Sequence, residues 1–463
     1  MLKYSRVLFI LFFLIYFLQI NAQVHSDYVP IKLSEAGSNE LKSILHRDIS
    51  HIKAQKGSGN IDETGLYKAT DLELKEYVKK GVILYDDTLS RYVASVANQL
   101  VVSRPSLRNQ FKIYILKSTV SNAYTYANGA ILVTTGLLAK LTSKSQLAFI
   151  IGHELGHLSK KHNEASFDKE FTLKKDFKLA SEGNENTLQV LMHYSKEFEM
   201  EADAIGVELM NGAGFNGNEA LKAIKILTPF DTSYKYVKID IKKIFSSPDF
   251  NIDSALAHSS NNYSNYKDDG DDKLSTHPDL DKRYIAIKEL LANMPGIITK
   301  EIPSDSINYV EISYVARMED IQSAFESANY SGSFYLSLKE MQTDPNNKYL
   351  KLMVARNLVW LANYKDNNVL NHAMSDQNNL YGRRFKDIET FIKSLSSNDF
   401  KKLSYSYIKH NYNTSGKNEE LSFYMAYISD FYLGGGVSRF YFNQYLKDYP
   451  NGKYTGYAEN KLQ

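Results

Sequence analysis

The pattern of apolar and polar residues in the first half of the chain follows two regular secondary-structure periods. Residues 72–100 carry apolar side chains at helical spacing, with an interruption near Gly81. Residues 111–116 alternate as a β-strand does, and residues 130–134 form a second short run that is apolar and β-branched. We therefore predict helices beside a small sheet, which either borders a binding cleft or is an ordinary hairpin with no role in binding.

Two further helices are predicted downstream of this sheet. Apolar residues recur at helical spacing and without proline over residues 145–152, so that a helix can continue into the residues that follow. A second helix is predicted from about residue 186 to residue 211, where Gly212 ends it. Residues 228–276 are irregular and polar, and so long a stretch is typical of a functional loop or of disorder.

The last third of the chain is helical in pattern and rich in tyrosine from about Ile302 onward. Over residues 334–364, small residues and Leu and Tyr residues occupy the positions expected in helix-turn-helix repeats of about 34 residues. A tetratricopeptide-like array is one interpretation of this pattern, and a non-repetitive helical bundle is the other. Both interpretations predict an all-α domain for interactions with other proteins.

Length and composition set the broad class of the protein. With 463 residues the chain is too long for one core of ordinary size, so several domains are expected. The 55 Lys and Arg residues nearly balance the 53 Asp and Glu residues, and the net charge of +2 gives no electrostatic basis for binding nucleic acid. The chain has no cysteine, which excludes disulfides, thiolate metal ligands and a lipid anchor on cysteine.

Residues 1–22 have the pattern of a secretory signal peptide. Two basic residues give a positive start, residues 7–18 form an apolar core, and Ala22 supplies a small residue for cleavage. Because that core is short for a membrane span, we expect a periplasmic or secreted protein, with an uncleaved membrane anchor as the alternative. Residues 23–69 are polar and are expected to form an N-terminal leader that packs loosely on the first domain.

The most specific chemical signal is the sequence HELGH at residues 153–157. On a helix, His153 and His157 lie four residues apart on one face, where both imidazoles can bind one zinc ion. Glu154 lies beside them and can act as general base on a metal-bound water. A chance occurrence is the alternative, but the apolar residues before the motif favour the helix that zinc binding requires.

A third metal ligand has to come from another part of the chain. Glu199 is the candidate, because it and Asp203 lie four residues apart on one face of the second predicted helix. Glu199 can then bind the metal while Asp203 orients a ligand histidine. A solvated acidic helix face is the alternative on spacing alone, and surface residues of that kind are expected at Glu197, Glu201 and Glu208.

Four ordered motifs resemble the family of zinc metallopeptidases that includes the CAAX prenyl protease and the heat-shock protease HtpX. The similar region covers roughly residues 70–295. The motifs are similar to the family's edge strand, its HELGH helix with a later histidine, its ExxAD signature and its late THP element. In this chain they are Asn122-Ala123 with Asn128-Gly129 and residues 131–138, His153 to His157 with His162, residues 199–206, and Thr276-His277-Pro278 with Arg283.

The resemblance implies a site for one zinc ion per chain. The expected zinc ligands are His153, His157 and Glu199. Glu154 is expected to act as the general base, and His162 to be a buried, hydrogen-bonded structural histidine. Asp203 belongs to the ExxAD signature and keeps its expected role beside a ligand histidine.

Two residues of the late element are expected to act above the metal. His277 and Arg283 would lie over the cleft and stabilise the developing oxyanion. His277 could instead occupy the open position on zinc and act as a gate in a resting enzyme. The family's edge strand implies that substrate adds as an extended strand through backbone hydrogen bonds. The residues expected for this strand are Asn128, Gly129, Ile131 and Val133.

Together these observations predict an α+β fold that is mainly helical. We expect a zincin-type metallopeptidase domain with a small edge-strand sheet at residues 70–298, and an all-α, tetratricopeptide-like domain at residues 299–463. The predicted function is that of an exported zinc-dependent endopeptidase acting on unfolded or misassembled envelope proteins. The alternative is a chaperone or assembly factor whose C-terminal helices bind an envelope or membrane-assembly protein. Glu154 favours the enzyme, since a silent peptidase needs no carboxylate there.

Overall fold

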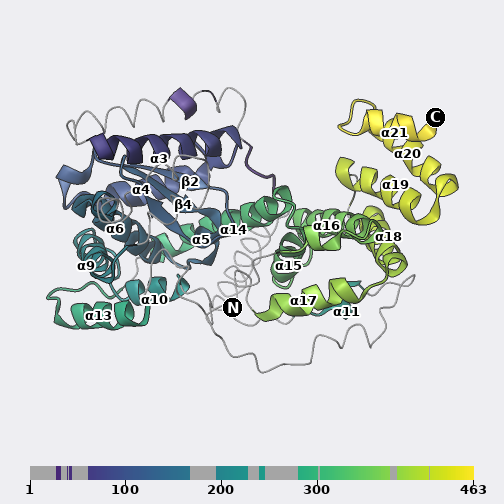
Figure 1. Ribbon diagram of the computed structural model, residues 1–463. Helices are drawn as coiled ribbons and strands as arrows, with labels where there is room; N and C mark the ends of the chain where they lie inside the picture. The colour runs from purple at the N-terminus through teal and green to yellow at the C-terminus, as the bar shows by residue number, and fades with distance from the viewer. Residues whose placement is uncertain are drawn as a thin grey trace, which may run out of the picture. The chain divides into compact units, whose positions relative to one another are not determined.

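A computed structural model gives the fold of the chain. It describes residues 28–32, 39, 41–43, 61–166, 194–227, 239–245, 280–300, 303–375, 383–414, 416 and 418–463. These residues form two compact units (Figure 1). The described residues of the first unit lie within 31–227 and 280–320, and those of the second lie within 28–30, 239–245 and 321–463. The fold is α+β and mainly helical, as predicted.

The first unit contains a four-stranded sheet. Its strands are β1 (Ile83–Leu84), β2 (Lys112–Leu116), β3 (Ala123–Thr125) and β4 (Ala130–Thr134). They lie in the order β1-β2-β4-β3, with β2 and β4 parallel and the two outer pairs antiparallel. The two strands predicted from the sequence are the central pair, and the outer strands are too short for an alternating pattern to reveal them.

Helices cover both faces of this sheet, because its side chains alternate between two apolar cores. Helix α3 (Ile61–Lys79) covers one face, while α4 (Thr88–Leu100) and α6 (Lys144–Lys160) cover the other (Figure 1). The sheet residues in the core with α3 are Tyr114, Leu116, Ala130 and Leu132. Those in the core with α4 and α6 are Ile115, Ile131 and Val133.

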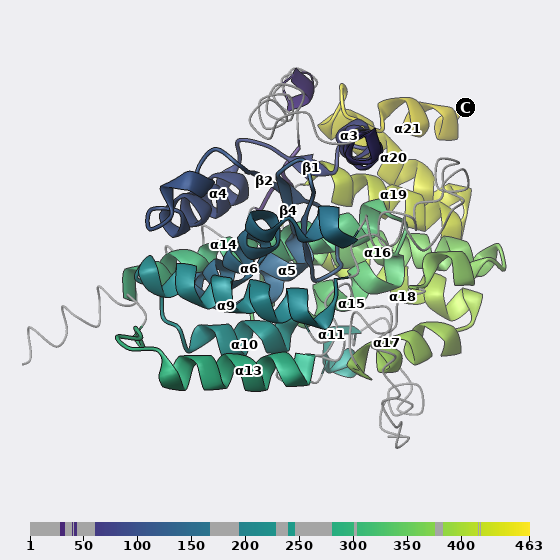
Figure 2. The ribbon, with the colours of Figure 1, turned by 60° about the vertical axis from the view of Figure 1, so that its left-hand side comes forward.

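Several shorter elements complete the first unit. They are α5 (Thr135–Lys140), α9 (Lys196–Gly212), α10 (Glu219–Ile226), α13 (Leu280–Asn293) and the 3₁₀ turn η1 (Pro105–Leu107). Figure 2 shows α9, α10 and α13 side by side. Helix α9 begins at Lys196 and not near residue 186, because the Ser195 hydroxyl caps it by accepting a hydrogen bond from the Phe198 amide.

Helix α14 (Pro303–Glu326) belongs largely to the first unit, although the sequence pattern predicts a domain boundary near residue 298. Tyr309 is buried in the apolar core of that unit, and its hydroxyl donates to the Leu138 carbonyl over 3.1 Å. The compact unit therefore ends at Asp320, within the helix. Polar residues before α14 suggest a linker, but the buried face of the helix decides where the domain ends.

A buried ion pair ties α14 to the end of β2. Lys117 Nζ lies 3.0 Å from Glu319 Oε2, and both side chains are buried. The other carboxylate oxygen of Glu319 accepts a hydrogen bond of 2.6 Å from the Ile31 amide. Part of the predicted leader is thus held against the first unit. Helix α3 also extends that unit to Ile61, ahead of the predicted domain start at residue 70.

The described part of the second unit is entirely helical. After α14 it contains α15 (Tyr330–Glu340), α16 (Lys348–Asp366), η5 (Leu370–Ala373), α17 (Arg383–Ser394), α18 (Ser397–Thr414), α19 (Glu419–Leu433), α20 (Gly435–Asp448) and α21 (Thr455–Leu462). Helices α17, α19 and α21 begin 36 residues apart, close to the period of about 34 residues of helix-turn-helix repeats. Helices α15 and α17 are farther apart, so a regular repeat array stays a prediction.

Helix α11 (Ile241–Phe245) belongs to the second unit, although it lies within the residues predicted for the peptidase domain. Phe245 packs near Phe334, Phe391 and Tyr407, with ring centroids 6.0, 6.3 and 5.4 Å from its own, respectively. Contacts between aromatic rings far apart in the sequence leave no trace in local periodicity. The range predicted for the peptidase domain, 70–298, therefore differs from the first unit at its start, at its end and around α11.

The predicted signal peptide at residues 1–22 lies outside the described residues. Within the described ranges, no helix combines the length and the apolar character needed to cross a bilayer. Cleavage of the signal peptide and its retention as an anchor both stay predictions.

Shortening the chain at α14 tests the boundary. A chain ending at residue 326 should show a cooperative unfolding transition of the first unit, whereas a chain ending at residue 300 should lose it. The shorter chain lacks Tyr309 and leaves the buried Lys117 ammonium without its carboxylate partner, a loss that costs about 3–5 kcal/mol. Urea unfolding followed by circular dichroism measures this. Equal unfolding midpoints in the two chains would show that α14 is not part of the core.

Candidate metal centre

The HELGH residues lie in a helix that is buried along most of its length. Helix α6 begins after Ser143, whose hydroxyl accepts a hydrogen bond from the Gln146 amide. The helix is buried on every side from residue 145 to residue 158. His153 and His157 are therefore enclosed one turn apart, which argues against a chance motif on a solvated surface.

Helices α6 and α9 cross with their backbones in contact, because small residues lie at the crossing. A side-chain carbon added at Gly156 would lie 2.9 Å from the Cα atom of Ala202. One added at Gly206 would lie 3.0 Å from the amide nitrogen of His153. This close approach brings Glu199, one turn before Ala202 on α9, within reach of both histidines of α6.

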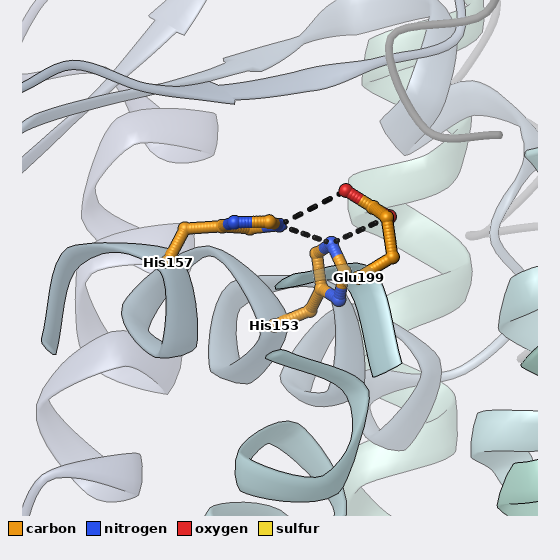
Figure 3. A group of neighbouring side chains, drawn as sticks. All are labelled: His153, His157 and Glu199. Carbon is orange, nitrogen blue, oxygen red and sulfur yellow. Dashed lines mark hydrogen bonds and ion pairs between the residues drawn. The ribbon is translucent and has the colours of Figure 1, made fainter. Parts of the chain in front are cut away.

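His153, His157 and Glu199 turn their polar ends toward one another (Figure 3). His153 Nε2 and His157 Nε2 are 3.0 Å apart. Glu199 Oε1 lies 3.3 Å from His157 Nε2, and Glu199 Oε2 lies 3.7 Å from His153 Nε2. All three side chains are buried, and together they form a group that can hold a metal ion.

The spacing and the chemistry of these atoms fit zinc. In tetrahedral coordination with bonds of about 2.0–2.1 Å, two ligand atoms lie about 3.3 Å apart. The observed separations of 3.0, 3.3 and 3.7 Å span that value. Two imidazoles and one carboxylate also leave a fourth position for water or substrate. Three buried carboxylates and one guanidinium give the cluster a formal charge of −2, which a divalent cation would neutralise. These groups are Glu154, Glu199, Asp203 and Arg283.

Asp203 lies behind His153, on the side away from the other ligands. Its Oδ1 lies 2.8 Å from His153 Nδ1, and a proton on Nδ1 leaves the Nε2 lone pair for a metal. Arg283 Nε and Nη2 donate to the two oxygens of Asp203, each over 2.7 Å. Burial alone would raise the pKa of Asp203, but the Arg283 guanidinium and the His153 hydrogen bond hold that pKa below its ordinary value. Asp203 is therefore a carboxylate at neutral pH.

Arg283 also lies behind the ligand cluster, and not over a cleft as the family resemblance implies. Besides its bonds to Asp203, its Nη1 lies 2.6 Å from Glu199 Oε2, so the guanidinium joins these two buried carboxylates of α9. The cause is its place on α13, where Arg283, Ile287 and Leu291 form one buried face at helical spacing. A guanidinium directed at two carboxylates orients a ligand and does not face an oxyanion.

His277, the other residue expected over the metal, lies outside the described residues. Its two expected positions, as an oxyanion donor and as a gate on zinc, therefore stay predictions. The described side chains that contact the metal ligands come instead from α6, α9 and α13 and from the residues that follow α6 and precede α9.

Strand β3 holds the candidate base Glu154. Thr125, the last residue of that strand, donates its hydroxyl to Glu154 Oε2 over 2.6 Å. The same hydroxyl lies 3.1 Å from the Glu154 carbonyl oxygen. These contacts orient the carboxylate relative to the sheet. Sequence reasoning missed Thr125, because a strand of three residues gives no periodic signal.

Tyr194 covers one face of the His157 ring. The two rings stack with centroids 3.8 Å apart and 19° between their planes. The Tyr194 hydroxyl donates to Asn163 Oδ1 over 2.7 Å, and Asn163 Nδ2 donates to the Thr125 carbonyl over 2.9 Å. Burial, reinforced by nearby carboxylates, raises the pKa of Tyr194 well above its ordinary value, so the phenol stays neutral. No motif indicated Tyr194 or Asn163.

His162 contacts Nδ1 of His157, the ring nitrogen that does not face His153 and Glu199. It is buried, and its Nδ1 lies 2.9 Å from His157 Nδ1, while its Nε2 lies 3.1 Å from Glu201 Oε2. Lys160 donates to the other oxygen of Glu201. Burial lowers the pKa of His162 although Glu201 opposes the shift, so the ring is mainly neutral at pH 7. Glu201, expected from the sequence as a surface residue, is therefore bonded to a buried histidine.

The substrate edge strand has to be reassigned. Ile131 and Val133 belong to β4, which pairs with β2 on one side and with β3 on the other. A strand with two neighbours cannot accept a third, so among the described strands the edge beside Glu154 is β3. An apolar run such as that of β4 predicts a strand but not its place in the sheet. Asn128 and Gly129 lie in the turn between the two strands.

Comparisons with known proteins match the part of the chain that carries this site. The sequence pattern of peptidase family M48 matches residues 86–291. The chain is 22% identical over 165 residues to the beta-barrel assembly-enhancing protease of Yersinia pestis. The aligned region covers 32% of this chain and 34% of that protein. It is 20% identical over 153 residues to the protein of that name from Escherichia coli strain K12. That aligned region covers 29% of this chain and 31% of the relative.

A mitochondrial protein is similar over a shorter region. The chain is 29% identical over 113 residues to the mitochondrial metalloendopeptidase OMA1 of Arabidopsis thaliana, which covers 23% of each chain. The chain spans about a third of the length of the two bacterial proteases that it matches. The family match covers the metal centre and stops before α14, so it leaves out helices α15 to α21 of the second unit.

Gly156→Ala tests whether the crossing of α6 and α9 sets the ligand geometry. The new methyl group would meet the Ala202 backbone, so we expect a loss of about 1–3 kcal/mol in unfolding free energy and weaker zinc binding. Gly456→Ala in α21 is the control, since nothing lies within 4 Å of the added carbon. Urea unfolding and a zinc titration give the two readouts. Wild-type zinc affinity in Gly156→Ala would show that the helices can separate without moving Glu199.

Arg283→Met tests the placement of the guanidinium. Its loss leaves Asp203 and Glu199 buried without a counter-charge, so the free energy of unfolding should fall by about 3–5 kcal/mol. Arg283→Lys should recover only part of this, because an ammonium cannot form the fork of bonds. Arg104→Met breaks an exposed pair with Glu208 and should cost under about 1 kcal/mol. Wild-type stability with lost activity in Arg283→Met would instead support an oxyanion role.

Proposed function

Because its residues 86–291 belong to peptidase family M48, we propose that this chain is an exported zinc-dependent endopeptidase. The observation that carries the proposal is the meeting of three ligand atoms, from His153, His157 and Glu199, at separations that suit one zinc ion. Glu154 follows directly after the first of these ligands and is a carboxylate with no ligand role. A site built only to bind metal for structure would use a fourth protein ligand in its place.

The proposed reaction is hydrolysis of a peptide bond. Zinc would lower the pKa of a coordinated water toward neutrality and polarise the scissile carbonyl. Glu154 accepts a proton from the attacking water and donates it to the leaving nitrogen. Thr125 keeps the Glu154 carboxylate in place through its 2.6 Å hydrogen bond. Asp203 turns the metal-binding nitrogen of His153 toward the site, so that the ligand is oriented before substrate arrives.

Substrate would lie along β3 as an extended chain. Asn122 and Tyr126 direct their backbone hydrogen bonds toward β4, so Ala123 and Thr125 direct theirs to the outer side. Asn122 Oδ1 accepts from the Ala123 amide and Asn163 Nδ2 donates to the Thr125 carbonyl, each over 2.9 Å. We assign the other two groups, the Ala123 carbonyl and the Thr125 amide, to substrate. Pairing through the backbone selects unfolded chains of many sequences.

Unfolded or misassembled envelope proteins are the proposed substrates. Two relatives of the chain are named beta-barrel assembly-enhancing proteases, which supports a role in the envelope. Residues 1–22 support it independently, because their pattern is that of a signal for export, which would place the protein in the periplasm. The proposed substrate class and location rest on this combination.

The second unit supports a further part of the proposal. Six large hydrophobic side chains among the described residues of 321–463 are between 38% and 65% exposed. They are Trp360, Val369, Leu433, Val437, Phe440 and Tyr457. Val437 and Phe440 lie one turn apart on α20, and an exposed apolar helix face of this kind favours binding to another protein, such as an envelope assembly protein. These side chains also favour the second candidate function, that of a chaperone or assembly factor, which predicts that activity does not need Glu154.

Glu154→Gln separates the two functions. The amide keeps the shape of the side chain but cannot accept the proton, so the variant should fold, bind one zinc ion and lose about 10²–10⁴-fold of its kcat on unfolded casein. Zinc is measured by elemental analysis, and cleavage by release of labelled peptides.

His153→Ala is the matched control, since it should lose both zinc and activity. Activity of Glu154→Gln within tenfold of wild type would show that another base operates. Absence of cleavage by the wild type, together with undiminished binding of unfolded protein, would favour the chaperone.

A further inference from the structure

His157 and His153 are supported in different ways. His153 Nδ1 contacts the Asp203 carboxylate directly, over 2.8 Å. His157 Nδ1 contacts a second imidazole, that of His162, over 2.9 Å. The other nitrogen of His162 lies 3.1 Å from Glu201 Oε2, so a carboxylate is reached here only through an intervening ring.

A left-handed residue brings His162 to this position. Helix α6 ends at Lys160, and Lys161 has φ 56° and ψ 40°. In an uninterrupted helix, a residue five positions after His157 would lie about 140° around the axis from it and could not reach its ring. The reversal at Lys161 turns the chain so that His162 lies back against His157. A lysine in this conformation costs about 1–2 kcal/mol, which the contacts of the residues that follow have to offset.

The hydrogen-bonding capacity of the two rings fixes where their protons lie. His157 Nε2 faces His153 Nε2 and Glu199 Oε1, and it can bind a metal only through an unprotonated lone pair. The proton of a neutral His157 then lies on Nδ1, which donates to His162 Nδ1. His162 in turn carries its proton on Nε2 and donates it to Glu201. A metal at Nε2 of His157 therefore requires one arrangement of protons: His157 is protonated on Nδ1, His162 is protonated on Nε2, and Glu201 accepts the last hydrogen bond.

The rings that form this arrangement are held by packing. His162 stacks on Phe198 with ring centroids 4.2 Å apart and 7° between the planes. Phe198 precedes Glu199, so the residue that holds His162 is adjacent to a metal ligand. On the outer side, Lys160 binds Glu201, whose side chain is 41% exposed. The series of hydrogen bonds runs from His157 through His162 to Glu201. Its His157 end is therefore enclosed and held by packing, and its Glu201 end reaches the surface.

We propose that His162 and Glu201 are positioning residues for the metal centre, and that they set the orientation and the metal-binding nitrogen of His157. The inference rests on the proposed function, because it assumes that His157 binds zinc. Neither residue touches the metal, and each acts through its neighbour. Glu201 keeps the proton of His162 on Nε2, and His162 keeps the proton of His157 on Nδ1.

Zinc affinity is the direct measure of this role. Removing a group that supports a ligand histidine weakens metal binding by about 10–100-fold. His162→Ala should show a loss of that size, because the Nδ1 proton of His157 loses its buried acceptor. His162→Asn should keep zinc affinity within about tenfold of wild type, since its amide oxygen can take the place of His162 Nδ1. Glu201→Ala should lie between these two variants.

The experiment measures the zinc dissociation constant of each full-length variant by competition with a chromophoric chelator. Absorption spectra of the cobalt(II)-loaded proteins report ligand geometry without any need for activity. Glu208→Ala is the matched control, because Glu208 lies on the same helix and also forms an exposed ion pair, with Arg104. Its zinc affinity and cobalt spectrum should equal those of the wild type.

Several results would overturn the proposal. One is wild-type zinc affinity in His162→Ala, and another is an equal loss in His162→Asn and His162→Ala, which would show that packing and not the hydrogen bond matters. If His162→Ala does not fold, Glu201→Ala decides, and affinity equal to that of Glu208→Ala would reject the role of Glu201. A wild-type protein that binds no zinc would instead refute the proposed function itself.

Discussion

The contact between the backbones of α6 and α9 is the constraint on which the metal centre depends. Side-chain carbons added at Gly152, Gly156 or Gly206 would all lie 2.9–3.1 Å from atoms of the opposite helix. Larger residues would place side chains between the helices and separate their axes. Only because the two backbones touch can the short Glu199 side chain of α9 reach two imidazoles of α6. The same approach places Asp203 behind one of them, so ligand and support come from a single crossing.

The parts of the site that depend on local spacing could be predicted from the sequence. His153, Glu154 and His157 are adjacent on a helix whatever the rest of the fold does, and Glu199 and Asp203 share a face of α9 for the same reason. The ordered motifs also predicted the family, and the match of peptidase family M48 confirms it. Helix α6 and the two central strands were predictable because each contains apolar residues at the period of its own structure.

What depends on tertiary contact could not be predicted in this way. The apolar run of β4 shows a strand but does not say that β2 and β3 flank it, so the edge was assigned to the wrong strand. Arg283 looks like a cleft residue in its motif, yet Ile287 and Leu291 turn its helix face inward. His162 is one residue beyond a left-handed Lys161, a conformation that no periodicity indicates. Tyr309 closes the first unit from a helix assigned to the second.

Thr125 joins two functions that are usually separate. Its backbone lies on the outer strand of the sheet, and its hydroxyl holds Glu154, the proposed base. A peptide paired with that strand can move along it only in steps of two residues, about 6.6–6.8 Å, because the backbone groups repeat at that interval. The base stays where Thr125 holds it. The sheet would then act as a ruler, so that the bonds cut in an unfolded chain are selected by their distance from a bound segment and not by the identity of the side chains beside them.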